Sequence, residues 1–567
     1  MHGPKFSENI NVLFAERAPE LRFDEDEVLH GFIMDDCDHI INTIPILEYE
    51  ERYLTATDSE SYICLSICSY GRCMESVKIK SSTLFTENAF VSRYGNQPFS
   101  AFDKSLWEIF FKTIKVMLPE IEQRVIYGYS GWTKKMDSYL FGSIMIDANN
   151  AFSIKSTLAK TDTLLSRKSP TDVCKIVDTI AKSISAEPLV GYIFLMYLEL
   201  SHSKQRFVMS HHLCPEFVIS INGETGSYKT TVSTAFFNTY DGSTASFEDT
   251  LASIRRSFQS NKSGITIVDD YKINSKQNDA KYEKIVRLAG DINTTGKYVI
   301  GNKVVDELIT GMSVITGEKR PQLQQSSYSR ILFVDVGQFP INQTGLTELQ
   351  HHKSEMNSFV TLFIQFILQN PSFDTDCVDL FNKYRDELLK NTSFPRMHGR
   401  YYSMYAWFAV MWDVYVKFLS RYGVNVDYDF KTKIKHYILA QHNMYDNNPI
   451  KLFKTAYLEL VDANEIIVTD KDGVDTLTFD VLQLDDVLFL KSNGAYKKVC
   501  KYWQDKGIEF PVSERKLRKL LHEAHILKPK DGHLTYERKT RDNRSYSGYS
   551  LFKNYFYDYG GKENDKF

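Results

Sequence analysis

The sequence predicts a multidomain α/β protein, with a mixed α+β region before a parallel-sheet core and a basic region after it. Three observations predict this class. The chain has 567 residues, too many for one hydrophobic core, so about three or four domains are expected. Short apolar runs alternate with helical stretches between Glu216 and Val336, as they do in α/β domains. Lysine and arginine cluster near the C-terminus.

The composition is that of a globular protein, with 43% hydrophobic and 25% charged residues. Because the net charge is only −4, any nucleic-acid-binding surface must be a local patch. No run of eighteen apolar residues occurs and the first residues do not resemble a signal segment. We therefore expect no membrane partner and a cytoplasmic location.

The eight cysteines do not indicate a disulfide framework in a chain of this length, and a reducing compartment is expected. Cys64, Cys68 and Cys73 lie close together in sequence, which leaves zinc binding open. Their spacing is not C-x-x-C, however, and 62–70 has the pattern of a buried strand. A structural role is the simpler interpretation.

The expected domains follow the order of these patterns. Residues 1–165 form a strand-rich α+β accessory domain with one helix at Ser105–Val116, and 166–344 form the α/β core with two preceding helices. Residues 345–447 form a helical region, and 448–567 mix short helices with strands. The helices expected in the third domain are Met356–Leu368, Cys377–Lys390 and Tyr401–Tyr422.

A phosphate-binding loop is predicted after the apolar run Phe217–Asn222. Strand, glycine-bearing loop and Lys-Thr at the start of a helix is the context that a P-loop requires. In such a loop, backbone N–H groups and Lys229 bind phosphate oxygens, and the Thr230 hydroxyl binds Mg²⁺. Tyr228 stands where a glycine is usual, so it must tolerate the loop's backbone shape. The predicted nucleotide-binding residues are Gly223, Glu224, Thr225, Gly226, Ser227, Tyr228, Lys229 and Thr230.

An acidic pair ends the apolar run Gly264–Asp270, about forty residues after the loop. Asp269 is predicted to hold the Mg²⁺ shell and Asp270 to orient the attacking water. An apolar run ending in two acids is usually a strand with solvated charges. In this position after a P-loop, it predicts ATP and Mg²⁺ as cofactors.

Two further strands fit the same core. The strand ending at Thr316 would place a polar side chain near the γ-phosphate or the water. Arg330 opens the next strand and is predicted to reach a neighbouring subunit's phosphate, because guanidinium is permanently charged and matches phosphate geometry. Arg320 is the rival candidate for this role, and a surface ion pair is the simpler alternative for Arg330.

Together these parts resemble an AAA+ core of the branch shared by superfamily III and minichromosome-maintenance-like helicases. Within it, the chain is most similar to the self-loading replication initiator-helicases of staphylococcal pathogenicity islands and cassette chromosomes. The resemblance covers about Gly191 to Val336 and, more loosely, the C-terminal segment. Tyr127–Trp132 also resembles a Gly-Trp element found upstream of the ATPase in some proteins of mobile elements. These helicases often carry asparagine where this chain has Thr316, so the sensor residue departs from the pattern.

A hairpin is predicted at Lys297–Glu307, with a Gly-Asn turn between two short runs. In the resembled families this hairpin projects into a ring channel and a basic residue at its tip holds the DNA backbone. The resemblance implies this role for Lys303, with Lys297 at the base. Such phosphate contacts carry no sequence information, which suits a translocating motor. A plain surface hairpin is the alternative.

The basic C-terminal segment predicts a winged helix-turn-helix. Ala495–Lys506 and Ser513–Ala524 have helical patterns, with Ser513 as the N-cap of the second helix. Strands at 526–528 and 549–552 would form the wing. The predicted DNA-contacting residues are Arg515, Lys516, Arg518 and Lys519 on the helix and Arg538, Lys539 and Arg541 on the wing tip. A solvated helix on a protein-binding domain is the alternative.

The leading hypothesis is an ATP-dependent DNA helicase and origin-binding initiator of a mobile genetic element, acting as a homo-oligomeric ring, most simply a hexamer. Its partners would be single-stranded DNA in the channel and origin duplex at the C-terminal domain. The alternative is an ATP-gated oligomeric DNA-binding regulator without unwinding activity. The Lys297–Glu307 hairpin discriminates between the two, because a regulator does not need a basic hairpin in a channel.

Overall fold

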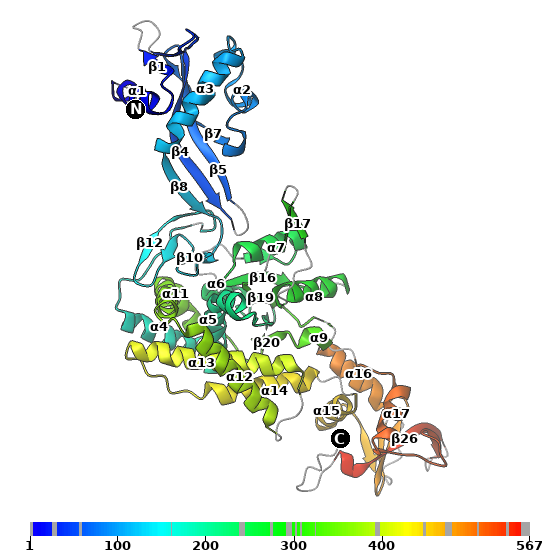
Figure 1. Ribbon diagram of the computed structural model, residues 1–567. Coiled ribbons are helices and arrows are strands. Elements are labelled where there is room, and N and C mark those ends of the chain that lie inside the picture. Colours follow the sequence, from blue (N-terminus) through cyan, green and yellow to red (C-terminus); the bar gives the residue numbers. More distant parts are fainter. Residues whose placement is uncertain are drawn as a thin grey trace.

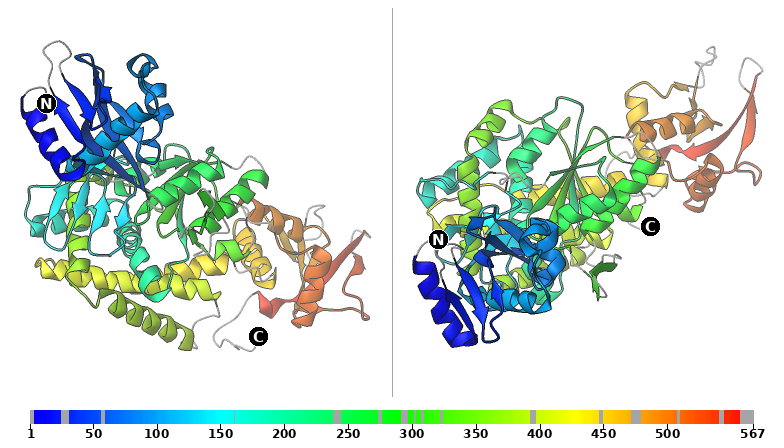
Figure 2. Two further views of the ribbon diagram at one scale, coloured as in Figure 1. Left: turned by 45° about the horizontal axis from the view of Figure 1, so that its top comes forward. Right: turned by 90° about the horizontal axis from the view of Figure 1, so that it is seen from above.

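The computed structural model describes residues 4–24, 31–55, 59–159, 161–237, 244–272, 276–290, 297–300, 303–306, 309–321, 323, 325–391, 397–445, 449–470, 479–506, 510–539 and 544–556. An N-terminal lobe and a C-terminal lobe lie at opposite ends of a central body that contains the parallel sheet (Figure 1). The two further views in Figure 2 keep these lobes apart. None of the described helices has the length and apolar character that a membrane crossing needs.

The N-terminal lobe combines a small sheet, β1-β2-β3, and a larger sheet with α-helices. Its elements are α1 (Pro4–Arg17), β1 (Leu21–Asp24), β2 (Phe32–Asp35), β3 (Ile40–Ile41), β4 (Thr43–Leu54), β5 (Ser59–Ser69), β6 (Arg72–Cys73), β7 (Val77–Lys80), α2 (Glu87–Tyr94), α3 (Lys104–Met117), β8 (Glu122–Tyr127) and β13 (Lys155–Ser156). The larger sheet has the order β13-β8-β4-β5-β6, with β7 also paired to β5. Asp103 caps α3 by accepting from the Leu106 N–H, and Trp107, Phe110 and Ile114 bury one face of that helix. The predicted strand at 62–70 and helix at Ser105–Val116 are confirmed.

A disulfide joins Cys68 to Cys73, which face each other in the β5–β6 pair with their Cα atoms 4.0 Å apart. The sequence indicated no disulfide framework, and one bonded pair occurs among the described residues. These two cysteines are neighbours because of the β5–β6 register, which their spacing in the sequence does not show. Their sulfurs are bonded to each other, so the zinc alternative for Cys64, Cys68 and Cys73 is wrong.

A second small sheet belongs to the central body by its packing. Its strands are β9 (Gly131–Trp132), β10 (Tyr139–Phe141), β11 (Ile144–Ile146) and β12 (Ala151–Ser153), in the order β12-β11-β10-β9. Trp132, Tyr139 and Phe141 share one buried cluster with helices of the core, whereas the cluster of the N-terminal lobe ends at Met117. The packing therefore changes earlier in the chain than the boundary expected at residue 165.

The central sheet is parallel throughout. The elements of this region are α4 (Pro170–Ser183), α5 (Pro188–His211), β14 (Val218–Asn222), α6 (Lys229–Phe237), β15 (Thr244–Ser246), α7 (Leu251–Ser260), β16 (Ile265–Tyr271), α8 (Lys276–Gly290), β19 (Met312–Gly317), α9 (Gln325–Tyr328) and β20 (Ile331–Asp335). The strand order is β15-β16-β19-β14-β20. Ile219 and Ile221 pack on the α5 side, whereas Val218 and Ile315 pack on the side of α7 and α8. Burial of both faces explains the nearly continuous apolar runs of these strands, and the predicted α/β core is confirmed.

A two-stranded hairpin stands between α8 and β19. Its strands, β17 (Lys297–Ile300) and β18 (Lys303–Asp306), are antiparallel, and Ile300 pairs with Lys303. The predicted turn residues 301 and 302 lie outside the described residues. Figure 1 shows the hairpin projecting from the body of the central sheet.

Helices follow the sheet, as predicted. They are α10 (Gln343–His351), α11 (Lys353–Leu368), α12 (Phe373–Lys390), α13 (Gly399–Arg421) and α14 (Phe430–Tyr445). Helices α12 and α13 pack against each other and against α5. Trp407, Phe408 and Tyr415 of α13 are fully buried, so these helices extend the core rather than form a separate layer.

The C-terminal lobe combines three helices with one sheet. Its elements are α15 (Pro449–Asp462), β21 (Val468–Asp470), β22 (Val481–Gln483), β23 (Val487–Lys491), α16 (Ala495–Asp505), α17 (Glu514–Glu523), β24 (Leu527–Lys528), β25 (Tyr536–Lys539) and β26 (Ser545–Phe552). The sheet order is β21-β22-β23-β26-β24, with β25 also paired to β26. The two predicted helices are present, and Ser513 caps α17 by accepting from the Lys516 N–H.

Candidate functional site

The predicted phosphate-binding loop connects β14 to α6 at the carboxyl edge of the sheet. All five residues of β14 are buried, and α6 begins at Lys229. Gly223 is tightly enclosed, because a Cβ there would lie 2.4 Å from Val336 Cγ2. Gly226 has φ +86°, in the left-handed region that favours glycine. These two glycines therefore have the backbone roles that the loop requires.

Tyr228 adopts the conformation of the glycine it replaces. Its φ is +61°, in the left-handed region, and its side chain is 42% exposed. The phenol is thus turned outward while the backbone keeps the curve of the loop. The departure from the motif changes the residue and leaves the loop's path intact.

Lys229 is directed back over the loop rather than into solvent. Its ammonium donates to the Glu224 carbonyl at 3.2 Å, and the residue is only 9% exposed. The Ser227 hydroxyl donates to the same carbonyl at 2.6 Å. A cation at the N-terminus of a helix, beside free backbone N–H groups, provides an anion-binding position.

Asp269 of β16 bonds to hydroxyl groups from helix α6 and strand β19. Its Oδ1 accepts from the Thr230 hydroxyl at 2.9 Å and also from the Thr316 hydroxyl. The Asp270 N–H donates to the Thr316 hydroxyl at 3.1 Å. The structure therefore brings together the predicted metal ligands Thr230 and Asp269 and the predicted sensor Thr316.

Asp270 points differently from Asp269. The β16–β19 register shifts between Val268 and Tyr271, and Asp270 has φ +70°. Such a bulge redirects successive side chains. The Asp270 carboxylate lies 2.8 Å from the Lys272 ammonium and is half-exposed. This ion pair raises the pKa of Lys272 through its hydrogen bond to Asp270.

The polar groups at this edge of the sheet fit Mg²⁺ and a nucleoside triphosphate. Hydroxyl and carboxylate oxygens are the ligands that Mg²⁺ prefers, and Thr230 and Asp269 place one of each within hydrogen-bond distance. The open space beside Gly226, where a Cβ would meet nothing within 4 Å, leaves the loop accessible. The residues present therefore suit the cofactors that the sequence predicts.

Residues that the sequence reasoning did not single out complete this edge. The Asn222 amide donates to the Lys319 carbonyl at 3.0 Å, and the Thr225 hydroxyl donates to the Glu318 carboxylate. These bonds fasten the loop to the segment after β19. The position of Asn222 at the end of a buried strand, directly before the loop, was the available sign of its role.

Arg330 and Arg320 lie at opposite ends of β20. The Arg330 carbonyl accepts from the Val218 N–H, at the amino end of β14, so about 16 Å of strand separates it from the loop. Its guanidinium donates to the Ser326 carbonyl at 2.7 Å, and the residue is 8% exposed. Arg320 instead lies 3.6 Å from Asp335, at the carboxyl end where the loop begins. Arg330 therefore cannot reach the nucleotide site of its own chain.

The Gly-Trp element is fixed onto the core rather than exposed. The Trp132 indole donates to the His202 carbonyl at 2.7 Å, and the Trp132 N–H donates to the Gln205 side chain at 3.2 Å. The Ser130 N–H donates at 2.8 Å to the carbonyl of Ser260, the last residue of α7, which precedes β16 in the chain. The element thus connects α5 with the segment leading to the acidic pair.

The predicted DNA-contacting residues of the C-terminal lobe divide into two groups. On α17, Arg515, Lys516 and Lys519 are exposed, whereas the Arg518 guanidinium lies 5.6 Å from the centre of the Tyr549 ring. On the strand pair β25–β26, Lys539 is exposed, and the predicted tip residue Arg541 lies outside the described residues. Leu517 and Leu521 are buried, so the basic side chains occupy the outward part of α17.

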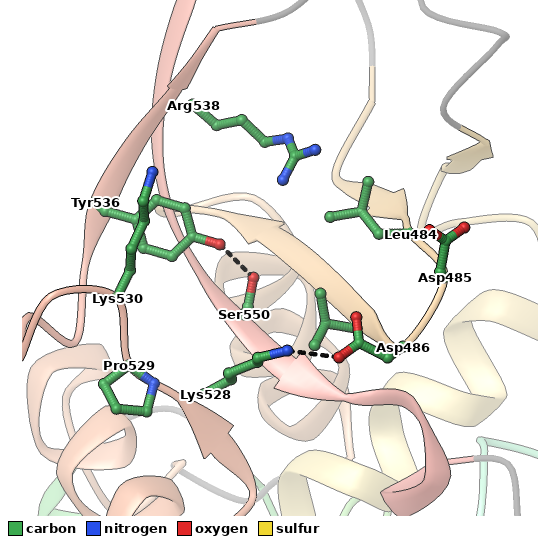
Figure 3. Close-up of a pocket in the computed structure, with 10 residues that line it drawn as sticks. Leu484, Asp485, Asp486, Lys528, Pro529, Lys530, Tyr536, Arg538 and Ser550 are labelled. Atoms are coloured by element: carbon green, nitrogen blue, oxygen red, sulfur yellow. Dashed lines mark hydrogen bonds and ion pairs between the residues drawn. The ribbon is translucent and has the colours of Figure 1, made fainter.

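Arg538 borders a cavity of about 320 Å³ rather than extending from a tip. Figure 3 shows its guanidinium directed from β25 toward Leu484 and Asp485. In the same cavity the Lys528 ammonium lies 2.5 Å from the Asp486 carboxylate. Acidic residues therefore face the basic ones here, which separates Arg538 from the exposed group on α17.

Comparison with solved structures shows a similar fold in a helicase. The structure titled "SCCmec type IV Cch - active helicase" matches with a TM-score of 0.51 and 11% identity, covering 94% of this chain and 98% of that chain. The NrS-1 C-terminal region matches with a TM-score of 0.27 and 9% identity over 89% and 96% of the two chains. The JCV helicase matches with a TM-score of 0.25 and 12% identity over 49% and 67%. The last two scores are too low to support an argument.

No protein-family model and no curated protein sequence matches the chain. At 11% identity, the likeness to the SCCmec helicase concerns the fold. The chain shares its overall architecture with that helicase.

Proposed function

We propose that this protein is an ATP-dependent replicative DNA helicase and origin-binding initiator of a mobile genetic element, acting in the cytoplasm as a hexameric ring. One observation carries the proposal. The Thr230–Asp269–Thr316 cluster lies at the carboxyl edge of the parallel sheet, and the β17–β18 hairpin precedes β19, the strand that carries Thr316. The proposed hydrolytic centre and the hairpin therefore lie at opposite ends of β19.

The chain's own residues divide the work of ATP hydrolysis. Lys229 and the N–H groups at the start of α6 would bind phosphate oxygens. Thr230 and Asp269 would hold Mg²⁺, and Thr316 would fix the orientation of Asp269 through the hydrogen bond that the structure shows. When bound, Mg²⁺ supplies positive charge that stabilises the transferring phosphoryl group. Asp270 would orient the attacking water after separating from Lys272, with which it is paired here.

A ring would complete the site from the neighbouring subunit. Arg330 is about one strand length from its own loop, so any phosphate that its guanidinium contacts would belong to another chain's site. Its burial requires the side chain to turn outward when subunits meet. Mixing Lys229→Ala and Arg330→Ala proteins tests this role, because mixed rings would contain some interfaces with both native residues. Recovery of ATP hydrolysis in the mixture is expected, and its absence would assign Arg330 a structural role.

Two surfaces would contact DNA. Lys303 follows the hairpin turn in the β17–β18 register and Lys297 lies at its base, so both would bind backbone phosphates in the channel. The C-terminal lobe would act as a winged helix, with α17 in the major groove and the β25–β26 pair on the backbone. Exposure of Arg515, Lys516 and Lys519 on one helix supports this assignment.

The test uses a forked duplex, ATP and three proteins. Wild type is expected to separate the strands, and Lys229→Ala to lose ATP hydrolysis while still binding origin DNA. Lys303→Ala is expected to hydrolyse ATP and bind DNA but to separate few strands. If wild type hydrolyses ATP without separating strands and Lys303→Ala leaves its activity unchanged, the helicase proposal fails.

The second candidate is an ATP-gated oligomeric regulator without unwinding activity. The Asp270–Lys272 ion pair and the buried Arg330 favour it, because both must rearrange before hydrolysis. Under this alternative, ATP without hydrolysis would change DNA affinity and assembly. The forked-duplex experiment separates the two candidates.

A further inference from the structure

Helix α5 carries a lysine in the interior of the central body. Lys204 is fully buried, with 0% of its surface exposed. Its ammonium donates to the Ala289 carbonyl at 3.1 Å and to the Gly311 carbonyl at 3.0 Å. A buried ammonium is tolerated only when its protons find such acceptors, so these two bonds determine where the side chain lies.

The two acceptors stand at the two roots of the hairpin segment. Ala289 is in the last turn of α8, whose carbonyls have no partner within the helix and carry the negative end of the helix dipole. Gly311 directly precedes β19. The chain leaves the core after the first root, forms β17 and β18, and returns at the second. One ammonium therefore connects the points of departure and return.

The returning root is also attached to the segment before β16. The Thr310 hydroxyl donates to the Lys262 carbonyl at 2.6 Å, and the Met312 N–H donates to the Gly264 carbonyl at 2.9 Å. The Gly264 N–H in turn donates to the Ser201 carbonyl of α5 at 3.2 Å. The root thus forms one hydrogen-bonded unit with α5 and with the start of the strand that ends in the acidic pair.

Strand β19 joins this unit to the nucleotide site. It runs from Met312, beside the root, to Thr316, which bonds to Asp269. A paired strand in a parallel sheet is stiff along its length, so a displacement at Thr316 is carried to Gly311. The side chain that holds both roots decides whether the hairpin follows this displacement or pivots freely.

We infer that Lys204 is a positioning residue for the β17–β18 hairpin: it holds the two roots together and so couples movement of β19 to movement of the hairpin. Lys204 is fully buried, so it would act through the two roots rather than by contact with nucleotide or DNA. The inference rests on the proposed function for its DNA readout, while its structural part, the restraint on the hairpin, can be measured without DNA.

The first measurement is hydrogen–deuterium exchange of the full chain without DNA. Lys204→Met removes the ammonium and keeps an unbranched side chain. Exchange at 297–306 is expected to become at least fivefold faster, while exchange at 218–222 stays within twofold of wild type. Ser203→Ala is the matched control, since the Ser203 hydroxyl is buried on the same helix and, within the described part of the chain, bonds only to the Glu199 carbonyl of that helix. Unchanged exchange at 297–306 in Lys204→Met would overturn the inference.

The second measurement is the number of base pairs separated per ATP hydrolysed. Lys204→Met is expected to lower this ratio at least tenfold with KM for ATP and DNA-free turnover within twofold of wild type. Parallel loss of hydrolysis and strand separation, or an unchanged ratio, would contradict the inference. If wild type separates no strands, the proposed function fails while the exchange result still decides the role of Lys204.

Lys204→Gln covers the case in which Lys204→Met is not recovered folded. Its neutral amide is shorter but keeps N–H donors, so an intermediate increase in exchange and an intermediate ratio are expected. Wild-type values for both measurements in Lys204→Gln would overturn the inference.

Discussion

Replacing His202 by leucine is expected to remove a pH dependence from the stability of the central core. His202 is buried on α5, and its Nδ1 lies 2.6 Å from the Tyr139 hydroxyl, while its Nε2 has no hydrogen-bond partner among the described residues. Burial lowers its pKa to about 3 from an ordinary value of about 6.5. The folded core therefore favours the neutral ring.

The sign and size follow from linkage. A base with a depressed pKa in the folded state contributes stability above the unfolded pKa of about 6.5, and this stability is lost as pH falls toward about 3. Because pH 5 is roughly 1.5 units below the unfolded pKa, the free energy of unfolding is expected to fall by about 2 kcal/mol at that pH. For a body of this size that corresponds to a decrease of about 4 °C in Tm. Burial raises the pKa of Glu199, which makes the folded state more stable as pH falls, but this effect is the same in wild type and in His202→Leu.

The assay is thermal unfolding followed by tryptophan fluorescence at pH 7.5 and pH 5.0. The Tm of wild type is expected to fall about 4 °C further than the Tm of His202→Leu between pH 7.5 and pH 5.0. A matching decrease in the variant would show that His202 is not held neutral by burial, and would refute the reasoning.

Three further predictions concern the core and the nucleotide site. Thr316→Val should lower the ATP hydrolysis rate roughly 10- to 100-fold, because it removes a charge-assisted hydrogen bond to Asp269. Thr316→Ser should retain most activity, and equal rates for the two variants would contradict this prediction. Glu199→Met should raise Tm at pH 8, because both Glu199 oxygens lack partners in the described part of the chain and burial raises the pKa of the carboxyl group. The variant should lose this advantage near pH 4.5, and an unchanged Tm at pH 8 would argue against the prediction. Tyr228→Gly should change Tm by no more than about 3 °C, because relief of left-handed strain offsets the greater freedom of glycine in the unfolded chain. Its KM for ATP should stay within threefold of wild type. A loss of ATP affinity would mean that the phenol contacts the nucleotide.

The backbone geometry of the candidate nucleotide site could be predicted from sequence because its determinants are local. The Gly223–Thr230 loop and the acidic pair each depend on an apolar strand followed by specific residues, and both lie where the sequence predicted. The α/β class of the core also follows from the alternation of apolar runs with helical stretches. Tyr228 fits for the same reason, since its φ depends on the loop itself.

Other features depend on contacts between distant segments and left no sign in the sequence. The different directions of Asp269 and Asp270 result from a register shift against β19. Lys204 belongs to an apolar helix, and its acceptors are backbone carbonyls that have no residue pattern. Likewise, Trp132 packs on α5, about seventy residues later in the chain. No local pattern indicates this contact, so the sequence did not show that residues before 165 pack on the central body.

The central claim, that ATP hydrolysis moves this protein along DNA, is tested most directly by following both processes in one reaction. Wild type is incubated with a forked duplex, and phosphate release and strand separation are recorded together. We expect strand separation to require hydrolysable ATP, to stop with a non-hydrolysable analogue and to disappear in Lys229→Ala. A wild-type protein that binds the fork and releases phosphate while the duplex stays intact would contradict the claim.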